Sequence, residues 1–65
     1  MKVKRLLVVT KRFPLFLVLD REANGWAYEV REEATSRLVC YGWTAGTKAE
    51  AVDEARAHAA KTLKI

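Results

Sequence analysis

The chain has 65 residues and a mass of 7.4 kDa, so the sequence predicts a single small domain over residues 1–65. Hydrophobic residues make up 51% and charged residues 31%, a composition too apolar for intrinsic disorder. The formal net charge of +4 permits an acidic partner such as nucleic acid without requiring one. A chain this short has no room for a cofactor domain beside a substrate domain, and we expect no enzymatic activity.

The first two expected strands cover residues 3–10 and 15–20. The segment 3–10 is rich in β-branched and apolar residues, and its flanking lysines and arginines are typical of an edge strand. Pro14 cannot donate a hydrogen bond to a β-ladder, so it fits the start of a strand. The unbroken apolar run from Leu15 to Leu19 indicates a central strand that is covered on both faces.

Two further strands are expected at residues 26–32 and 37–43. Asn24-Gly25 is a strong turn signal before the first of them, because both residues tolerate positive φ. Alternation in the second strand places Leu38 and Cys40 toward the core. The residues on its opposite side are Arg37, Val39, Tyr41 and Trp43. Gly42 within this segment indicates a bulge or a strand end.

Residues 48–63 have the pattern of a helix. Thr47 and Glu50 have the spacing of a capping box, in which each side chain accepts a hydrogen bond from the other residue's backbone amide. The expected core consists of Trp26, Tyr28, Val30, Leu38, Cys40, Val52, Ala55, Ala59 and Leu63. The predicted fold is therefore α+β: an antiparallel sheet of three or four strands, followed by one C-terminal helix packed on one face.

The sequence gives little indication of a metal site, a disulfide or a membrane-spanning segment. Cys40 is the only cysteine, so we expect a reduced thiol, a cytoplasmic location and no disulfide. One cysteine and one histidine cannot supply an ordinary zinc site, and we predict no metal and no cofactor. His58 follows Glu54 by one helical turn, which predicts an ion pair between them. The apolar run 6–9 is too short for a signal peptide or a membrane span.

Three motifs carry a resemblance to a known family. Trp26-Ala27-Tyr28-Glu29-Val30-Arg31-Glu32, Ser36-Arg37-Leu38 with Gly42, and Thr47-Lys48-Ala49-Glu50-Ala51 occur in that order. Together they resemble the W-x-x-E-I-R strand, the R-x-W-L-G strand and the T-x-E-E-A-A helix start of the AP2-type DNA-binding domain. The likeness covers residues 25–60, and the arm-binding domains of bacteriophage integrases are similar in layout and size. It implies a phage or mobile-element protein whose exposed sheet face lies in the major groove of double-stranded DNA.

Carried over by position, the resemblance places Glu29, Arg31 and Arg37 at contact positions, while the family's third-strand tryptophan falls at Val39. Arginine can hydrogen-bond guanine through two donors, and a pair of strands fits the major groove. The full set of expected nucleic-acid contacts is Glu29, Arg31, Arg37, Tyr41, Lys2, Lys4, Arg5, Lys11 and Arg12. An equally open interpretation is that the two strand arginines only pair with neighbouring glutamates.

A second function is also consistent with the sequence. Gly42, the segment 47–51 and the alanine-rich helix are similar to the HicB-type antitoxin domain, which implies a protein partner. An exposed apolar strand invites dimerisation or capture of a partner, and the expected interface is Leu15, Phe16, Leu17, Val18 and Leu19. The alternative is therefore a protein-interaction module without nucleic-acid binding: a homodimer, an antitoxin or a small inhibitor of a host protein.

Overall fold

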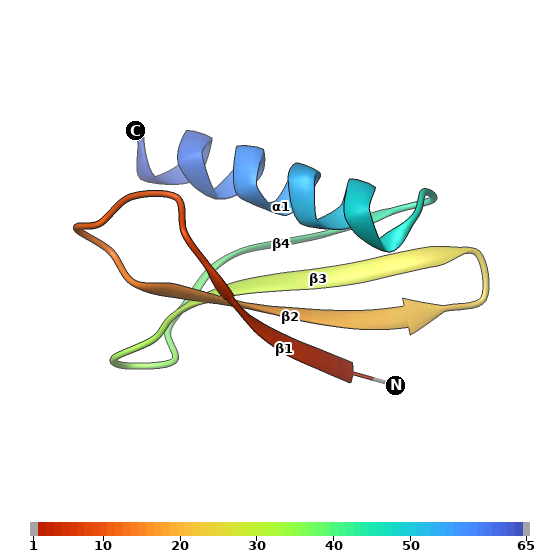
Figure 1. Cartoon of the computed structure of the whole chain (residues 1–65), viewed down its shortest axis with the longest axis horizontal. Coiled ribbons are helices and arrows are strands. Elements are labelled where there is room, and N and C mark those ends of the chain that lie inside the picture. Colours follow the sequence, from red (N-terminus) through yellow and green to blue (C-terminus); the bar gives the residue numbers. More distant parts are fainter. Residues whose placement is uncertain (1, 65) are drawn as a thin grey trace.

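The computed structural model describes residues 2–64 and contains four strands followed by one helix (Figure 1). These elements are β1 (Lys2–Leu7), β2 (Leu15–Glu22), β3 (Gly25–Glu32), β4 (Leu38–Thr44) and α1 (Lys48–Leu63). Each strand pairs antiparallel with its neighbour in the chain, so the order in the sheet is β1-β2-β3-β4. The predicted α+β fold is confirmed, with four strands and with β2 in the interior of the sheet.

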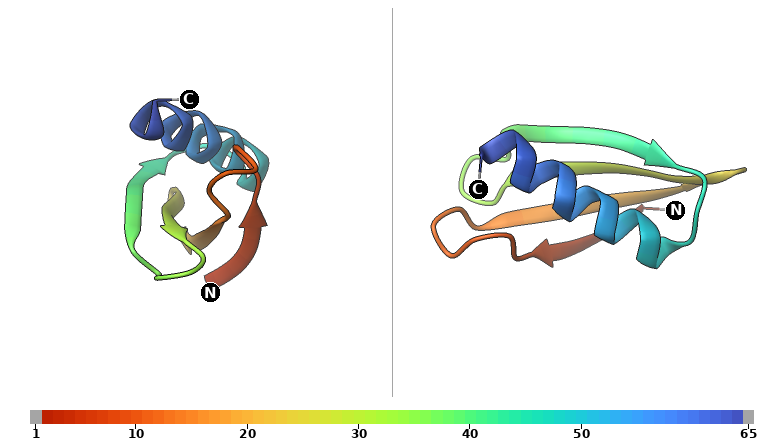
Figure 2. Two further views of the ribbon diagram at one scale, coloured as in Figure 1. Left: turned by 90° about the vertical axis from the view of Figure 1, so that its left-hand side faces the viewer. Right: turned by 90° about the horizontal axis from the view of Figure 1, so that it is seen from above.

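The helix crosses one side of the sheet diagonally and packs mainly on β4 and β3 (Figure 2). Its start is a capping box: the Glu50 amide donates to the Thr47 hydroxyl at 3.2 Å, and the Thr47 amide donates to the Glu50 carboxylate at 3.1 Å. The predicted helix start is therefore confirmed. The opposite side of the sheet has no covering layer within residues 2–64, and we call it the open face.

The core lies between α1 and the helix-facing side of the sheet. Leu15, Leu17 and Leu19 alternate along β2 toward this side, and each has 0% exposure. The buried cluster comprises Leu7, Leu15, Leu17, Leu19, Tyr28, Val30, Cys40, Ala51, Val52, Ala55 and Ala59. The small alanine side chains bring the helix close to the strands. Trp26 and Leu63 pack against this cluster and are only partly buried.

A β-bulge in β4 reverses two of the predicted side-chain directions. Val30 pairs with Cys40, but the next residue, Arg31, pairs with Leu38, so that Val39 is left over. As a result Val39 packs against the core, whereas Leu38 lies on the open face with 40% exposure. The prediction that Leu38 is a core residue is therefore wrong, and the bulge lies at Val39 rather than at the glycine three residues later.

The same bulge moves Arg37 to the helix-facing side. The Glu32 amide donates to the Arg37 carbonyl at 2.9 Å, which places these two residues opposite each other. Directly opposed residues in antiparallel strands share a side of the sheet, and Glu32 shares its side with Val30. Arg37 accordingly lines a shallow hollow with Thr62 and Leu63 of the helix. The prediction that it lies away from the helix is wrong.

The β2–β3 turn depends on glycine for a reason that differs from the predicted one. Glu22 pairs with Gly25, so the turn residues are Ala23 and Asn24, and neither of them has positive φ. A Cβ on Gly25 would instead lie 2.1 Å from the carbonyl oxygen of Thr44. Glycine is required here because the end of β4 approaches the backbone closely, and not because of the conformation of the turn.

The hydroxyl of Tyr28 makes a polar contact between β3 and α1. The Tyr28 hydroxyl and Nδ1 of His58 lie 3.0 Å apart, and the two rings meet edge to face. The histidine therefore bonds to this tyrosine rather than forming the predicted ion pair with Glu54. Burial, together with the Glu54 carboxylate, raises the pKa of Tyr28 to about 12, so the phenol is protonated at neutral pH. Gly42 makes room for the ring, because a Cβ there would lie 2.5 Å from the phenol oxygen.

We expect Tyr28→Phe to flatten the alkaline pH dependence of stability. The folded-state pKa of about 12 lies above the ordinary value of 10.0, so the stabilisation is complete below pH 10 and is lost as the pH rises through 12. By pH 11 the parent should have lost about 1 kcal/mol of unfolding free energy through this residue. Urea unfolding of both proteins at pH 9 and pH 11 measures the difference. Equal alkaline losses in the two proteins would contradict it.

Candidate nucleic-acid interface

The open face consists of three cross-strand rows of side chains. The strand register gives these rows as Leu6–Phe16–Arg31–Leu38, Lys4–Val18–Glu29–Tyr41 and Lys2–Asp20–Ala27–Trp43. Lysines therefore lie on β1 at one edge, aromatic rings lie on β4 at the other edge, and both carboxylates lie on the two middle strands. The face is mixed in charge: its lysines and its exposed aromatic rings lie at opposite edges, and Arg31 lies on the middle strand β3.

Phe16 is buried on the open face although no second layer covers it. Its exposed fraction is 9%, and the Lys4 ammonium nitrogen lies 4.3 Å from the centre of its ring. Leu6 and Arg31 flank it in the same row. A lysine stem can cover apolar surface while its charged end remains in water. Neighbouring side chains thus provide the second covering that the sequence predicts for β2.

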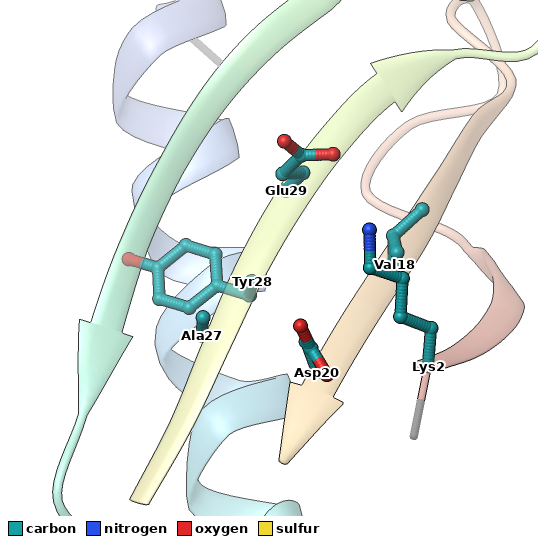
Figure 3. A pocket seen from close by; sticks show the side chains of 6 residues that line it. All are labelled: Lys2, Val18, Asp20, Ala27, Tyr28 and Glu29. Atoms are coloured by element: carbon teal, nitrogen blue, oxygen red, sulfur yellow. The ribbon is translucent and has the colours of Figure 1, made fainter. Parts of the chain in front are cut away.

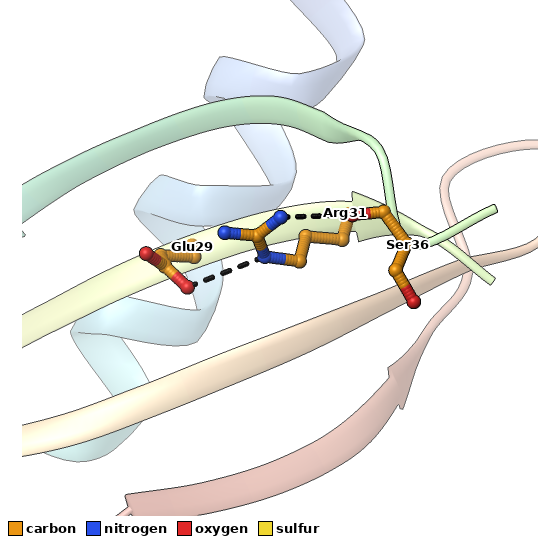
Figure 4. A network of polar contacts seen from close by, with 3 residues as sticks. All are labelled: Glu29, Arg31 and Ser36. Atoms are coloured by element: carbon orange, nitrogen blue, oxygen red, sulfur yellow. Dashed lines mark hydrogen bonds and ion pairs between the residues drawn. The ribbon is translucent and has the colours of Figure 1, made fainter.

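Arg31 connects the open face to the β3–β4 turn (Figure 4). Its Nε donates to the Glu29 carboxylate at 3.4 Å, and its Nη1 donates to the Ser36 carbonyl at 2.8 Å. Ser36 has a φ of 60°, a left-handed conformation that is unusual for serine, and the guanidinium contact helps to hold it. Arg31 thus has a structural role, and the guanidinium has five donors, of which these bonds use two.

A small hollow lies on the open face between the row that contains Glu29 and the row that contains Ala27 (Figure 3). Its volume is about 100 Å³, and it is lined by Lys2, Val18, Asp20, Ala27, Tyr28 and Glu29. It exists because Ala27 is the smallest side chain of its row. Small-molecule sites usually measure about 300–1,000 Å³, so a hollow of this size suits a few water molecules. The open face is therefore suited to act as a surface rather than as a ligand pocket.

Two aromatic side chains stand out from β4 on the open face. Tyr41 is 68% exposed and Trp43 is 47% exposed. They are two residues apart on one strand, so both point to the same side. Trp43 is absent from the set of residues expected to contact nucleic acid, although the alternation of its strand already places it beside Tyr41. Exposed aromatic rings of this size are unusual on a surface without a partner.

The structure brings five of the expected contact residues together on the open face and separates the others. Those on the face are Lys2, Lys4, Glu29, Arg31 and Tyr41. Arg5 points to the helix side of β1, where it lines a groove with Lys48, Asp53 and Arg56 of α1. Lys11 and Arg12 lie exposed in the connection between β1 and β2, and Arg37 lies beside the end of the helix.

The apolar run 15–19 is divided between the two sides of the sheet. Leu15, Leu17 and Leu19 lie beneath the helix with no exposed surface, so a partner cannot reach them in the folded chain. Phe16 and Val18 point to the open face. Of the five expected interface residues, only these two therefore lie on the open face, because the period of a strand sends alternate side chains to opposite sides.

Other chemistry has little support in the described part of the chain. Cys40 is buried, and burial raises the pKa of its thiol, which makes the thiol a poor nucleophile at neutral pH. Residues 2–64 contain no group of three or more histidine, cysteine, aspartate or glutamate side chains that could hold a metal ion. Over the same range there is no helix whose length and apolar character would let it cross a membrane.

Comparison with known proteins identifies no relative. No protein-family model matches the chain, and no curated protein or solved structure matches it either.

Proposed function

We propose that the protein binds double-stranded DNA through the open face of its sheet. The observation that carries the proposal is that the lysines of β1 and the exposed aromatic rings of β4 share this face, on either side of two middle strands. The net charge of +4 favours an anionic partner. The resemblance of residues 25–60 to the AP2-type domain supports duplex DNA as that partner.

The sheet is slightly wider than the major groove, so its two middle strands could enter the groove while its edge strands lie over the sides. Three inter-strand spacings of about 4.8 Å separate β1 from β4, which makes about 14 Å. The major groove is about 12 Å wide. The edge strands would therefore lie over the two walls of the groove, and Lys2 and Lys4 of β1 can contact the phosphates of one wall. The middle strands would face the base edges.

The middle strands carry the groups that could read bases. Arg31 can donate two hydrogen bonds to guanine, and the Glu29 carboxylate can accept one from the amino group of cytosine. The bonds of Arg31 to Glu29 and to the Ser36 carbonyl use two of its five N–H donors, which leaves three donors for such a contact. The resemblance places both residues and Arg37 at contact positions, but Arg37 points to the helix side and has no part in the proposed interface.

The double variant Lys2→Gln with Lys4→Gln tests the phosphate contacts. Glutamine removes both charges and keeps the first part of the Lys4 stem that covers Phe16. We expect weaker binding to all duplex sequences, with the salt dependence of the affinity reduced by about two units, one for each lysine. The measurement is fluorescence anisotropy with random-sequence duplex DNA at several salt concentrations.

The matched control is Lys48→Gln with Lys61→Gln, which removes the same charge from exposed helix positions. This control should retain most of the affinity and the salt dependence of the parent. Arg31→Ala should cost about 1–3 kcal/mol of binding to a preferred sequence, and Arg37→Ala should cost much less. The proposal fails if the parent does not bind DNA at low salt, or if the two double variants lose affinity equally.

A protein-interaction module is the second candidate function, favoured by the number of exposed apolar side chains. They are Leu6, Val8, Phe13, Leu38, Tyr41 and Trp43. Scattered apolar residues are ordinary on a surface, but Leu6, Leu38 and the two β4 rings all belong to the open face. The mass of the protein in solution, measured on the sample used for DNA binding, distinguishes the two candidates. A stable oligomer without DNA affinity would favour the second.

A further inference from the structure

The two edges of the sheet are protected very differently. β1 carries three cations, Lys2, Lys4 and Arg5, among its six residues. β4 has seven residues and no charged side chain. An edge strand presents unpaired backbone N–H and C=O groups, and charged side chains are a common means of preventing another strand from pairing with it. β1 is thus blocked against a further strand, and β4 is open to one.

A groove runs beside the open edge of β4. It has a volume of about 490 Å³ and is lined by Leu38, Val39, Cys40, Tyr41, His58 and Thr62. The four strand residues are consecutive, so they form one wall of the groove. The two helix residues are one turn apart and form the other wall. A groove between a strand edge and a helix is the arrangement that accepts an added β-strand.

The side chains of β4 are also suited to pairing with an added strand. On the helix side it presents the small residues Cys40 and Gly42, which suit the space beneath α1. On the open face it presents Leu38, Tyr41 and Trp43, with exposed fractions of 40%, 68% and 47%. A second β4 added to the edge would bring these large side chains next to the large side chains of the other copy and remove part of their surface from water. Because the strand carries no charge, no like charges are opposed across such a contact.

We propose that β4 pairs antiparallel with β4 of a second copy of the chain, which joins two four-stranded sheets into one of eight strands. A contact of this kind is isologous: the same strand is used by both copies, and a two-fold axis closes the assembly as a dimer. The two open faces become one continuous surface, with the aromatic residues at its centre and the lysines of β1 at its outer edges. The proposal is independent of DNA binding.

Sedimentation equilibrium of the parent and two lysine variants tests the pairing. Tyr41→Lys introduces a charge on β4, and Leu6→Lys introduces the same charge on β1. Both replaced residues are exposed, at 68% and 63%, and both lie on the open face of an edge strand. We expect the parent to be a dimer that dissociates on dilution. Tyr41→Lys should weaken dimerisation at least tenfold, while Leu6→Lys should dimerise like the parent.

Amide hydrogen exchange locates the contact. In the parent at high concentration, β4 amides that point away from β3 should exchange slowly, and in Tyr41→Lys they should exchange as freely as other surface amides. Circular dichroism of both variants checks that they remain folded. The proposal is overturned if the parent is monomeric at every concentration, if the two variants weaken the dimer equally, or if a dimer forms without protecting the outward amides of β4.

Discussion

Leu17→Lys should prevent folding, whereas Val18→Lys should leave the protein folded. Leu17 has no exposed surface and faces the helix from the middle of β2. An unpaired ammonium there would cost several kcal/mol in lost hydration, and packing would be lost as well. A 65-residue domain has a total stability of only about 3–10 kcal/mol by per-residue scaling. This single substitution can therefore remove most or all of the stability.

Val18 is the matched control because it is the next residue and receives the same substitution. It points to the open face, between Lys4 on β1 and Glu29 on β3. A lysine there can extend into water, and the neighbouring carboxylate partly offsets repulsion from the other lysine. Far-ultraviolet circular dichroism and the dispersion of amide proton shifts report folding of both variants. If both fold, or if both unfold, the assignment of these residues to opposite sides of the sheet is wrong.

Gly25→Ala should be the most damaging of the glycine-to-alanine substitutions. The added Cβ would lie 2.1 Å from the Thr44 carbonyl oxygen and 2.9 Å from the Ala45 Cα. Both atoms belong to the backbone, so relief requires β4 and the connection to the helix to move. Steric overlap of this kind costs about 1–3 kcal/mol or more, and the loss should appear as a lower urea midpoint with an unchanged slope.

Gly46→Ala is the control for this second prediction. Its Cβ would meet only the carboxylate end of Glu50, at 2.8 Å, and that flexible side chain can turn away. Turning away weakens the capping box, while the loss of glycine flexibility in the unfolded state stabilises the fold, so the net change should stay below about 1 kcal/mol. Equal losses at the two positions would show that the close approach of Thr44 is not what requires a glycine at the start of β3.

Local patterns in the sequence determined the elements of this fold and their order. The capping box at Thr47 and Glu50 depends on contacts within four residues, and the helix begins where that spacing places it. The apolar run of β2 and the alternation of β3 likewise indicate strands from neighbouring residues alone. An antiparallel sheet with a C-terminal helix follows, because short connections favour pairing between consecutive strands.

The local sequence pattern determined only some of the residues that lie on the open face. Alternation along β3 correctly places Glu29 and Arg31 away from the helix, because an undisturbed strand keeps its period of two. It fails for Arg37 and Leu38, because the bulge at Val39 exists only in the pairing of β4 with β3. No local signal in the sequence marks Val39 as a bulge. Gly42, which the sequence suggests as a bulge, lies within the regular part of the strand.

The tertiary structure alone decided why particular residues are needed. A residue without a Cβ is required at position 25 because the backbone of Thr44, 19 positions later in the chain, approaches it closely. Tyr28 contacts His58 only because the diagonal helix carries the histidine over β3. The guanidinium of Arg31 reaches the Ser36 carbonyl only after the β3–β4 turn has formed. Hydrophobic periodicity reflects the backbone conformation of adjacent residues, whereas these contacts depend on the register and packing of segments that are distant in sequence.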